Sequence, residues 1–484
     1  MRGTIDRPAS GLVAGPTADL AAFVERVGRD GVPDSVRAVL GDAFVDSVGC
    51  GLFGLTTEAC RIVQDFAAEQ GGPQEASLWA SDGRRVSLGN AALSLGTAIH
   101  GFDFDDHSRA KIHPGAAVLP AVLGFAERDD LSGETALRAL AAGYEVMTRV
   151  SLAANPNSSR MRGWHLTGTT GTFGAAAASC VALGLDAWTA AGALGLAGTQ
   201  SAGLWAFNAD GAMSKRLHPG RSAQAGIVAT LLAASGFQGP RQILETGDGG
   251  FLAATSDDPR PGEVGRDLGR VWRLEGACFK PYSSCGSNHA AIDAAIRLIG
   301  EHGFGVGDIE RVVVGVSRVV ERQTGFPYRP STVLNAQMSI RYDVAVALLD
   351  GHALIAQFTP ERMADPELNS LIARVEVEVD AEMDAVYPAL YAGIVTIHLN
   401  DGRALRCRID HSKGMPENRM SSGELDAKFL SLGGAAVGDA AAERLLPILR
   451  GVFDLPSLAP LARQLGQLTI GGRSGTDDLM RVAS

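Results

Sequence analysis

The chain has 484 residues, of which 46% are hydrophobic and 20% are charged. That length and balance predict a folded protein of two or three domains with a sizeable core, and they exclude a largely disordered chain. The formal net charge of −11 argues against a general nucleic-acid-binding protein, which would carry a basic surface. If the ligand is anionic, a local basic cluster must overcome the field of the whole chain.

Cysteine usage and apolar windows bear on the compartment. The six cysteines include no C-x-x-C pair and are too few for a disulfide framework. The first residues contain no apolar segment of the kind found in a secretory signal. The most apolar window, residues 171–204, is interrupted by Asp186 and by glycines, so we interpret it as two buried helices rather than a membrane span. These features predict a cytoplasmic protein without membrane contact.

The first half of the chain has the pattern of a helical domain. Residues 1–19 read as a flexible lead, and residues 76–85 are short and turn-rich. Apolar residues at helical spacing predict helices at residues 20–27, 35–52, 58–69, 87–103, 114–127 and 134–153. Helix after helix without alternating strands predicts an α-helical domain over residues 1–273.

The pattern changes after about residue 269. One helix is predicted at residues 339–349, and Asp401 and Gly402 favour a hairpin turn. β-branched and partly alternating residues predict strands at residues 311–320, 373–379, 394–399 and 404–409. Residues 274–410 are therefore predicted to form a smaller α+β lid domain. Helices predicted at residues 422–432 and 440–449 return the chain, over residues 411–484, to a discontinuous helical domain, so the predicted fold class is mainly α with a smaller α+β domain.

A dense group of titratable residues occupies positions 100–113, with three histidines, three aspartates and two cations. Asp103, Asp106 and His107 would share one face if the preceding helix continued through them. A buried carboxylate beside a histidine is the usual arrangement for a general base. A metal site is the rival interpretation, because Asp and His also bind divalent ions, but the spacing matches no established signature. Aspartates that cap helix ends and face solvent are the other alternative.

Two further polar clusters follow. Residues 163–174 place His165 just ahead of a Gly/Thr-rich turn that leads into a helix, where backbone N–H groups could hold a carboxylate. No strand precedes this turn and the G-x-G-x-x-G spacing is absent, so NAD binding is not predicted. The third cluster supplies the basic groups that an anionic ligand requires, and it contains Lys215, Arg216, His218 and Arg221. The alternatives are a structural histidine in the first case and a solvated basic turn in the second.

The last cluster, residues 279–289, lies at the predicted domain junction, where small-ligand clefts are favoured. Lys280, Tyr282 and His289 are its candidate hydrogen-bond donors. Cys285 lies four residues before His289, but the motif of a cysteine hydrolase is missing. An ordinary interdomain turn is the alternative.

Taken together, these stretches resemble the MmgE/PrpD family over nearly the whole chain. The matching motifs are, in order, DFDD at 103–106 with HPG at 113–115, GWH at 163–165, KRLHPG at 215–220, KPYSSC at 280–285, HAAID at 289–293, AQMSI at 336–340 and PEN at 416–418. Each alone is weak, but seven in this order are specific.

The resemblance implies a helical domain with an α+β lid, a homodimer, and no metal or organic cofactor. The family includes 2-methylcitrate dehydratase, cis-aconitate decarboxylase and iminodisuccinate epimerase, whose substrates carry two or three carboxylates and undergo proton transfer next to one of them. A match to the decarboxylase motifs implies active-site roles for Asp103, His113, His165 and Lys215.

Two positions depart from the family pattern. His107 stands where relatives commonly have Thr, and Cys285 stands where the animal-type decarboxylase has a histidine. The second departure weakens the decarboxylase interpretation. Neither departure distinguishes a dehydratase from an epimerase.

We therefore predict a cofactor-independent lyase that acts on a small di- or tricarboxylate, most nearly a 2-methylcitrate dehydratase-like hydro-lyase. An epimerase or isomerase, a decarboxylase and an inactive carboxylate-binding protein stay open. Removing a proton next to a carboxylate builds charge on an anion, so the site needs cations and a base. His165 and His113 would be the acid/base pair, with Asp103 orienting one of them. The substrate carboxylates would be held by Lys215, Arg216, His218, Arg221, Lys280, Tyr282, His289 and His107.

Overall fold

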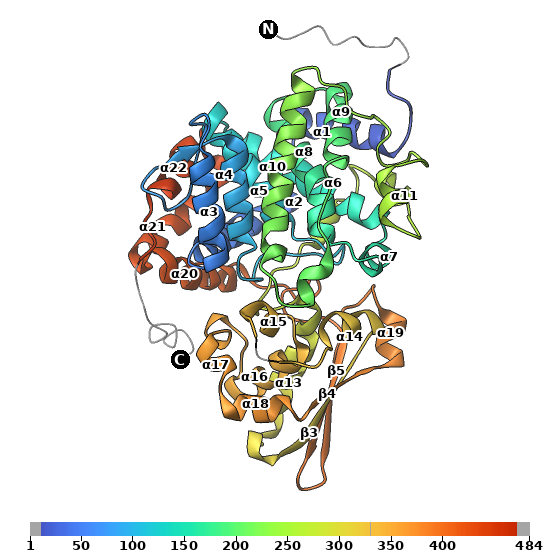
Figure 1. Ribbon diagram of the computed structural model, residues 1–484, viewed down its shortest axis with the longest axis vertical. Coiled ribbons are helices and arrows are strands. Elements are labelled where there is room, and N and C mark those ends of the chain that lie inside the picture. Colours follow the sequence, from blue (N-terminus) through green and yellow to red (C-terminus); the bar gives the residue numbers. More distant parts are fainter. Residues whose placement is uncertain (1–10, 330, 472–484) are drawn as a thin grey trace.

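The computed structural model describes residues 11–329 and 331–471. It is an elongated molecule in which a larger helical part lies against a smaller part that contains a sheet (Figure 1). Two predictions fall partly outside these ranges. The predicted absence of a secretory signal rests on the first residues of the chain, and the predicted returning segment includes residues 472–484. Among the described residues, no single helix is both long and apolar enough to cross a membrane, although one bent pair, residues 34–54 with 58–70, meets that test by length and composition.

Most of the first half of the chain is helical. Its helices are α1 (Pro16–Asp30), α2 (Asp34–Gly54), α3 (Glu58–Gln70), α4 (Leu88–Ile99), α5 (Pro114–Asp129), α6 (Gly133–Ala153), α7 (Pro156–Met161), α8 (Leu166–Ala182), α9 (Ala187–Gly198), α10 (Ser214–Ala234), α11 (Phe251–Thr255) and α12 (Gly262–Gly265). A two-stranded ribbon, β1 (Ala76–Ser77) with β2 (Arg85–Val86), connects α3 to α4. The end of the chain returns to this part as α20 (Ser422–Val437), α21 (Asp439–Arg450) and α22 (Ala459–Gln467), which pack on α2 and α5 (Figure 1).

The smaller part contains a four-stranded sheet in the order β4-β3-β5-β6, in which β3 and β4 are parallel and the other pairs antiparallel. Its strands are β3 (Ile309–Val316), β4 (Val375–Val379), β5 (Gly393–Leu399) and β6 (Ala404–Ile409). Its helices are α13 (His289–His302), α14 (Arg318–Thr324), α15 (Val333–Gln337), α16 (Ile340–Asp350), α17 (Pro360–Met363), α18 (Pro366–Ile372) and α19 (Ala381–Val386).

Each part has its own hydrophobic cluster. One cluster joins the first helices to Leu425, Phe429 and Leu445 of the returning segment. The other is built from α13, α16 and the sheet. The predicted fold class, mainly α with a smaller α+β domain, is confirmed, while the boundaries drawn at residues 273 and 410 stay predictions.

Four details of the predicted elements are wrong. Helix α1 begins at Pro16, inside the segment predicted to be a flexible lead through residue 19. The helix predicted over residues 87–103 ends at Ile99, because the chain turns after His100 and Asp103 adopts a left-handed backbone with φ of 53°. The strand predicted over 311–320 ends at Val316, because the Ser317 hydroxyl accepts a hydrogen bond from the Val320 N–H and caps α14. The Gly/Thr-rich turn after His165 is instead the first turns of α8.

Small residues explain why α4 and α10 lie so close together. A Cβ added to Gly96 of α4 would lie 2.6 Å from the Cα of Gly220 in α10, which is closer than side-chain and backbone atoms can pack. The high glycine content therefore serves close helix packing at this crossing. The crossing also sets the beginning of α10 beside the loop that follows α4, and that loop carries the titratable cluster.

Candidate active site

Asp103 is the centre of a buried ion bridge between the two parts of the molecule. Its Oδ2 lies 2.6 Å from Lys215 Nζ on α10, and its Oδ1 lies 2.6 Å from Lys280 Nζ in the segment before α13. Lys280 Nζ also donates to the Asp103 carbonyl at 2.8 Å. Burial alone would raise the pKa of Asp103, but the two ammonium groups outweigh it and hold that pKa well below its usual value. Asp103 is therefore an ionised carboxylate that positions both lysines.

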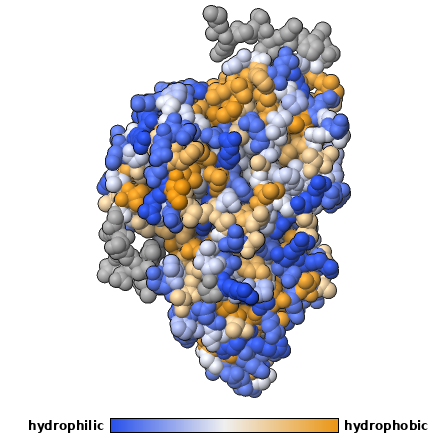
Figure 2. Space-filling model, viewed as in Figure 1, coloured by the Kyte–Doolittle hydropathy of each residue, from blue (hydrophilic) through white to orange (hydrophobic). Residues whose placement is uncertain are grey.

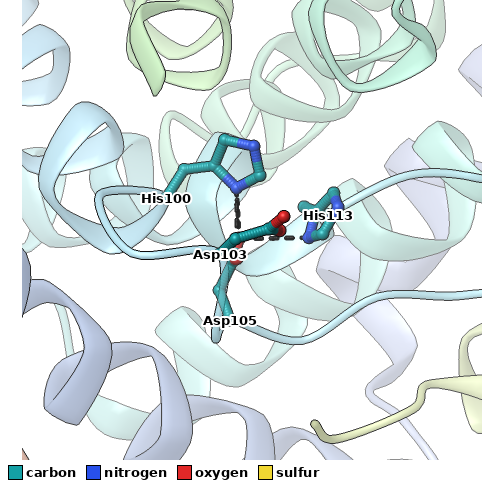
Figure 3. Close-up of side chains that lie close together, drawn as sticks. All are labelled: His100, Asp103, Asp105 and His113. Carbon is teal, nitrogen blue, oxygen red and sulfur yellow. Dashed lines mark hydrogen bonds and ion pairs between the residues drawn. The ribbon is translucent and has the colours of Figure 1, made fainter. Parts of the chain in front are cut away.

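Asp105, rather than Asp103, orients the neighbouring histidines (Figure 3). Its Oδ2 lies 2.9 Å from His100 Nδ1 and 3.3 Å from His113 Nδ1. Burial would raise the pKa of Asp105, but His100 and His113 outweigh it and hold that pKa well below the usual value. The expectation that Asp103 orients a histidine is therefore corrected, since both of its oxygens are taken by lysines. With Nδ1 turned to Asp105, the His113 ring presents Nε2 to the pocket.

His165 is the N-cap residue of α8 and is held from behind by His218. The two Nδ1 atoms are 2.9 Å apart, so one ring donates and the other accepts. Burial, followed by the nearby charges of His218, His100 and Lys215, lowers the pKa of His165 well below its usual value. Burial and Lys215 lower the pKa of His218 to about 4. Both rings are therefore neutral at pH 7.

One pocket joins these groups. Its lining includes Asp103, His107, Lys111, His113, Arg160, His165, Lys215, Lys280, Cys285, Gly286, Gln323, Met338 and Tyr391. Within the described chain, that lining carries four cationic side chains against one carboxylate. In addition, α5, α8 and α10 each begin beside this pocket, close to its lining residues His113, Leu166 and Lys215, so their N-terminal dipoles add positive potential. An acidic protein thus contains a strongly electropositive pocket.

The structure brings most of the candidate residues to this pocket or directly behind it. His107 lines the pocket, and His289 packs edge-on against His107 with ring centroids 6.2 Å apart. Burial and Lys280 lower the pKa of His289 to about 3. The Tyr282 hydroxyl donates to Asp293 at 2.6 Å and is directed away from the pocket lining. His289, Tyr282 and His218 therefore support the wall rather than form its surface.

The structure does not bring Arg216 or Arg221 to the pocket. The Arg216 guanidinium donates to the Gly101 carbonyl and, at 3.4 Å, to Gln337 Oε1 of the smaller part, so it joins the two parts. Arg221 is exposed and hydrogen-bonded to Gln224. The reason is that residues 214–234 form a helix with about 100° between successive residues, so Arg221 lies about 120° around the helix from Lys215, which lines the pocket.

Sequence reasoning missed several residues of the lining, among them Lys111, Arg160 and Tyr391. Lys111 was visible as one of the two cations in the 100–113 cluster. Arg160 stands five residues before His165 but on a separate short helix, α7, so no periodicity linked it to that motif. For Tyr391 no local signal was available, because it reaches the pocket from the segment before β5.

The rival metal interpretation can be tested against the same geometry. Ligand atoms of His100, Asp103, Asp105 and His113 lie within 4.8 Å of one another. However, both oxygens of Asp103 face ammonium groups at 2.6 Å, and a divalent cation would have to displace them against their repulsion. The donor set therefore suits an ion bridge better than a metal site.

The returning helix α20 also holds the loop that carries Asp103 and Asp105. Lys428 on α20 donates to the Phe104 carbonyl at 2.6 Å and pairs with Asp46 on α2 at 2.6 Å. The Gly115 N–H donates to Asp106 at 3.0 Å, so Asp106 faces the core and not the pocket. The loop that carries Asp103 and Asp105 is thus fixed from three sides.

Comparison with known proteins identifies the family. Sequence models of the MmgE/PrpD N-terminal and C-terminal domains match residues 18–263 and 282–451. The cis-aconitate decarboxylase-like protein oryM of Aspergillus oryzae is 28% identical over 94% of this chain and 97% of its own length. Cis-aconitate decarboxylase of Aspergillus terreus is 27% identical over the same shares, and that of Homo sapiens is 29% identical over 87% of this chain and 88% of its own. The chain belongs to the MmgE/PrpD family.

Proposed function

We propose that this protein is a lyase that acts on a small di- or tricarboxylate by proton transfer next to a carboxylate. The observation that carries the proposal is the pocket, whose wall holds four cationic side chains, one carboxylate and three histidines. Burial lowers the pKa of two of these histidines, His107 and His165, well below the usual value. Such a pocket concentrates a polyanion and can stabilise the extra charge that builds up when a proton or carbon dioxide leaves.

In the proposed mechanism His113 is the general base. Asp105 Oδ2 lies 3.3 Å from His113 Nδ1 and favours a proton on that nitrogen, so the lone pair on Nε2 is available to the substrate. Lys215 and Lys280 bind the carboxylate next to the reacting carbon. Asp103 fixes their two ammonium groups in advance, so they need no reorganisation as charge develops.

His165 is the general acid in this mechanism. When His218 Nδ1–H donates to His165 Nδ1, the His165 proton lies on Nε2 and can pass to the leaving group or the carbanion. Burial keeps the His165 ring neutral, so the ring becomes anionic as this proton leaves, and nearby cations such as Lys215 stabilise that charge until the ring takes up a proton again. A dehydration would use both histidines, one at the carbon and one at the departing hydroxyl.

Two reactions are candidates for this site. The relatives named above favour decarboxylation of a cis-aconitate-like acid as the first to test. The hydro-lyase reaction of 2-methylcitrate dehydratase is favoured by Cys285, which lines the pocket where the animal-type decarboxylase has a histidine. The Gln323 amide donates to the Cys285 sulfur at 3.2 Å, so at this position of the wall a thiol stands in place of an imidazole.

A substrate screen by NMR tests the proposal. Protein in chelator-treated D₂O is mixed separately with cis-aconitate, 2-methylcitrate and iminodisuccinate. We expect one acid to give a new product with deuterium at the carbon next to a carboxylate, and a His113→Gln preparation to give none, which excludes a contaminating enzyme. Acids that bind but neither change nor exchange hydrogen would instead indicate a carboxylate-binding protein.

We also propose that the protein is a homodimer. Exposed apolar side chains lie on the adjacent helices α3 and α10, at Ile62, Phe66, Val228 and Leu232, with 55, 50, 39 and 40% exposure. Figure 2 shows hydrophobic residues gathered over the helical part of the molecule on this face. Contiguous exposed apolar area of this kind marks interaction surfaces. Light scattering is expected to give twice the chain mass, and a Phe66→Glu/Leu232→Glu variant the mass of a single chain; a wild-type monomer would overturn the proposal.

A further inference from the structure

Lys111 is a cation in the pocket wall to which no role has been given so far. Its Nζ is shielded from solvent, and within residues 11–329 and 331–471 no group accepts a hydrogen bond from it. Its backbone has φ of 58°, a left-handed conformation that is uncommon for a residue with a long side chain. Hydrogen bonds from Lys111 N to the Ser108 carbonyl at 2.9 Å and from Ser108 N to the Ile112 carbonyl at 3.1 Å hold this turn. The loop thus directs an ammonium group into the pocket at some conformational cost.

Arg160 on α7 is a second buried cation of the pocket wall, and like Lys111 it has a buried side-chain nitrogen without a hydrogen-bond partner in the described part of the chain. It is 9% exposed, lines the same pocket, and its guanidinium carbon lies 3.9 Å from the ring centroid of Trp205. Its Nε has no hydrogen-bond partner among the described residues. Arg160 also lines a second, more open hollow together with Arg322 and Arg329, so it stands between the inner pocket and a basic approach from solvent.

The surroundings of these two cations differ from those of Lys215 and Lys280. The groups that face Lys111 are Arg160, Cys285, Tyr387 and Tyr391, with the Tyr387 ring centroid 5.0 Å from Nζ. Burial raises the pKa of both tyrosines, so they are uncharged. Asp103 neutralises half of the charge of Lys215 and Lys280, whereas no carboxylate of the described chain is paired with Lys111 or Arg160.

This arrangement is unfavourable until an anion binds. Burial and the charge of Arg160 lower the pKa of Lys111 to about 7, and burial and Arg322 lower the pKa of Arg160 to about 10. A carboxylate between the two cations would pair with both, and it would satisfy donors that are otherwise buried without partners. The tyrosine rings stabilise the ammonium only through their faces, which is a weaker contact than a charged hydrogen bond.

We propose that Lys111 and Arg160 form a second carboxylate subsite, which receives the substrate carboxylate farthest from the reacting carbon. The inference rests on the proposed function and narrows its substrate class to tricarboxylates, whose farthest carboxylate reaches Lys111 and Arg160, whereas a small dicarboxylate such as succinate is held near Lys215 and Lys280 alone. Lys111 and Arg160 are thus specificity-determining residues that do not take part in proton transfer.

Calorimetric binding of two inert acids tests the subsite without turnover. The probes are tricarballylate, which has three carboxylates, and succinate, which has two. Lys111→Met and Arg160→Gln are each expected to raise the dissociation constant of tricarballylate by about 10- to 100-fold, which corresponds to the loss of one charge-assisted hydrogen bond. The dissociation constant of succinate is expected to rise by less than about threefold in the same variants. Arg160→Lys, which keeps the charge, should recover part of the loss, and Arg403→Gln, on the exposed β5–β6 hairpin, serves as the matched control.

The pH dependence of binding separates a ligand-binding role from a structural one. Lys111 is protonated below pH 7 in the free protein, so tricarballylate binds most tightly there. Above pH 7 binding must take up a proton, and the dissociation constant rises by up to about tenfold per pH unit. Lys111→Met is expected to remove this slope, whereas a Lys111 that only packs on the tyrosines would leave it unchanged.

The outcomes distinguish the inference from the proposed function. If Lys111→Met weakens both acids equally, or leaves tricarballylate binding and its pH slope unchanged while the variant unfolds at the wild-type midpoint, the subsite is wrong. That result would stand even if the substrate screen succeeded. If instead no acid is turned over but tricarballylate binding depends on Lys111 and Arg160 as expected, the subsite is supported and the lyase activity alone is wrong.

Discussion

Replacing His113 by Gln is expected to lower kcat by about 10²- to 10⁴-fold, the usual contribution of a general base. Gln keeps a polar group of similar size but cannot take a proton from the substrate. The physical reason is the arrangement of Asp105, whose Oδ2 lies 3.3 Å from His113 Nδ1 and leaves Nε2 as the basic atom. Steady-state kinetics on the acid identified by the screen measure the effect, with His302→Gln, the same change at an exposed helix end, as the matched control.

Hydrogen exchange then separates the base from the acid. His165→Gln is expected to lower kcat by a similar factor, about 10²- to 10⁴-fold, but to retain exchange of the substrate hydrogen with solvent in a dehydration, because the base is intact. His113→Gln should lose both turnover and exchange. Wild-type kcat in His113→Gln would refute its role as the base, and exchange retained there but lost in His165→Gln would reverse the two assignments.

The histidines were accessible to sequence reasoning because each stands next to a helix boundary inside a recognisable motif. His113 precedes a proline that begins α5, and His165 precedes the start of α8. Helix N-termini are marked in sequence, and short polar motifs at such boundaries point toward ligand sites. The mainly helical first part and the β5–β6 hairpin at Gly402 could be predicted for the same reason, since they depend on local periodicity and turn chemistry.

What could not be predicted depends on contacts between distant segments. The helix after Ser87 ends early because Gly101 packs against another helix: a Cβ there would lie 2.7 Å from Cys60 Sγ. That early end is why Asp105, and not Asp103, faces the histidines. Arg221 could have been placed from the sequence, because the 3.6-residue period puts it about 120° around α10 from Lys215 once the segment is assigned to a helix.

Replacing Asp103 by Asn is expected to destabilise the protein by about 3–5 kcal/mol and to abolish turnover, because it leaves two buried ammonium groups without a counter-ion. The Lys215 and Lys280 side chains are 5 and 1% exposed, so water cannot take over the role of the carboxylate. Midpoints of thermal and urea unfolding measure the loss. The matched control is Asp454→Asn, which removes an ion pair with Arg37 at a side chain that is 79% exposed and should cost less than about 1 kcal/mol.

A double variant tests whether repulsion between the lysines is the cause. Removing one of them in Asp103→Asn/Lys215→Met leaves a single buried cation, so the double variant is expected to be more stable than Asp103→Asn. Additive losses from the two single changes would instead mean that Asp103 and Lys215 do not interact. Asp103→Asn with wild-type unfolding midpoints would show that the ion bridge adds nothing to stability.

The pH dependence of the unfolding free energy distinguishes the ion bridge from packing, because only the bridge depends on the ionisation of Asp103. The pKa of Asp103 is lowered in the folded protein, so its contribution is complete above the ordinary aspartate pKa of about 3.9 and is lost as pH falls toward the folded value. The difference in unfolding free energy between wild type and Asp103→Asn should therefore be constant from pH 5 to 8, by this rule, and shrink below about pH 4. The bridge joins α10 to the segment before α13. When Asp103 is protonated in acid, it no longer holds the Lys215 and Lys280 ammonium groups in place. Substrate affinity should therefore fall at a higher pH than the one at which the protein unfolds. That order would show that the Asp103 carboxylate positions the cations that bind the substrate.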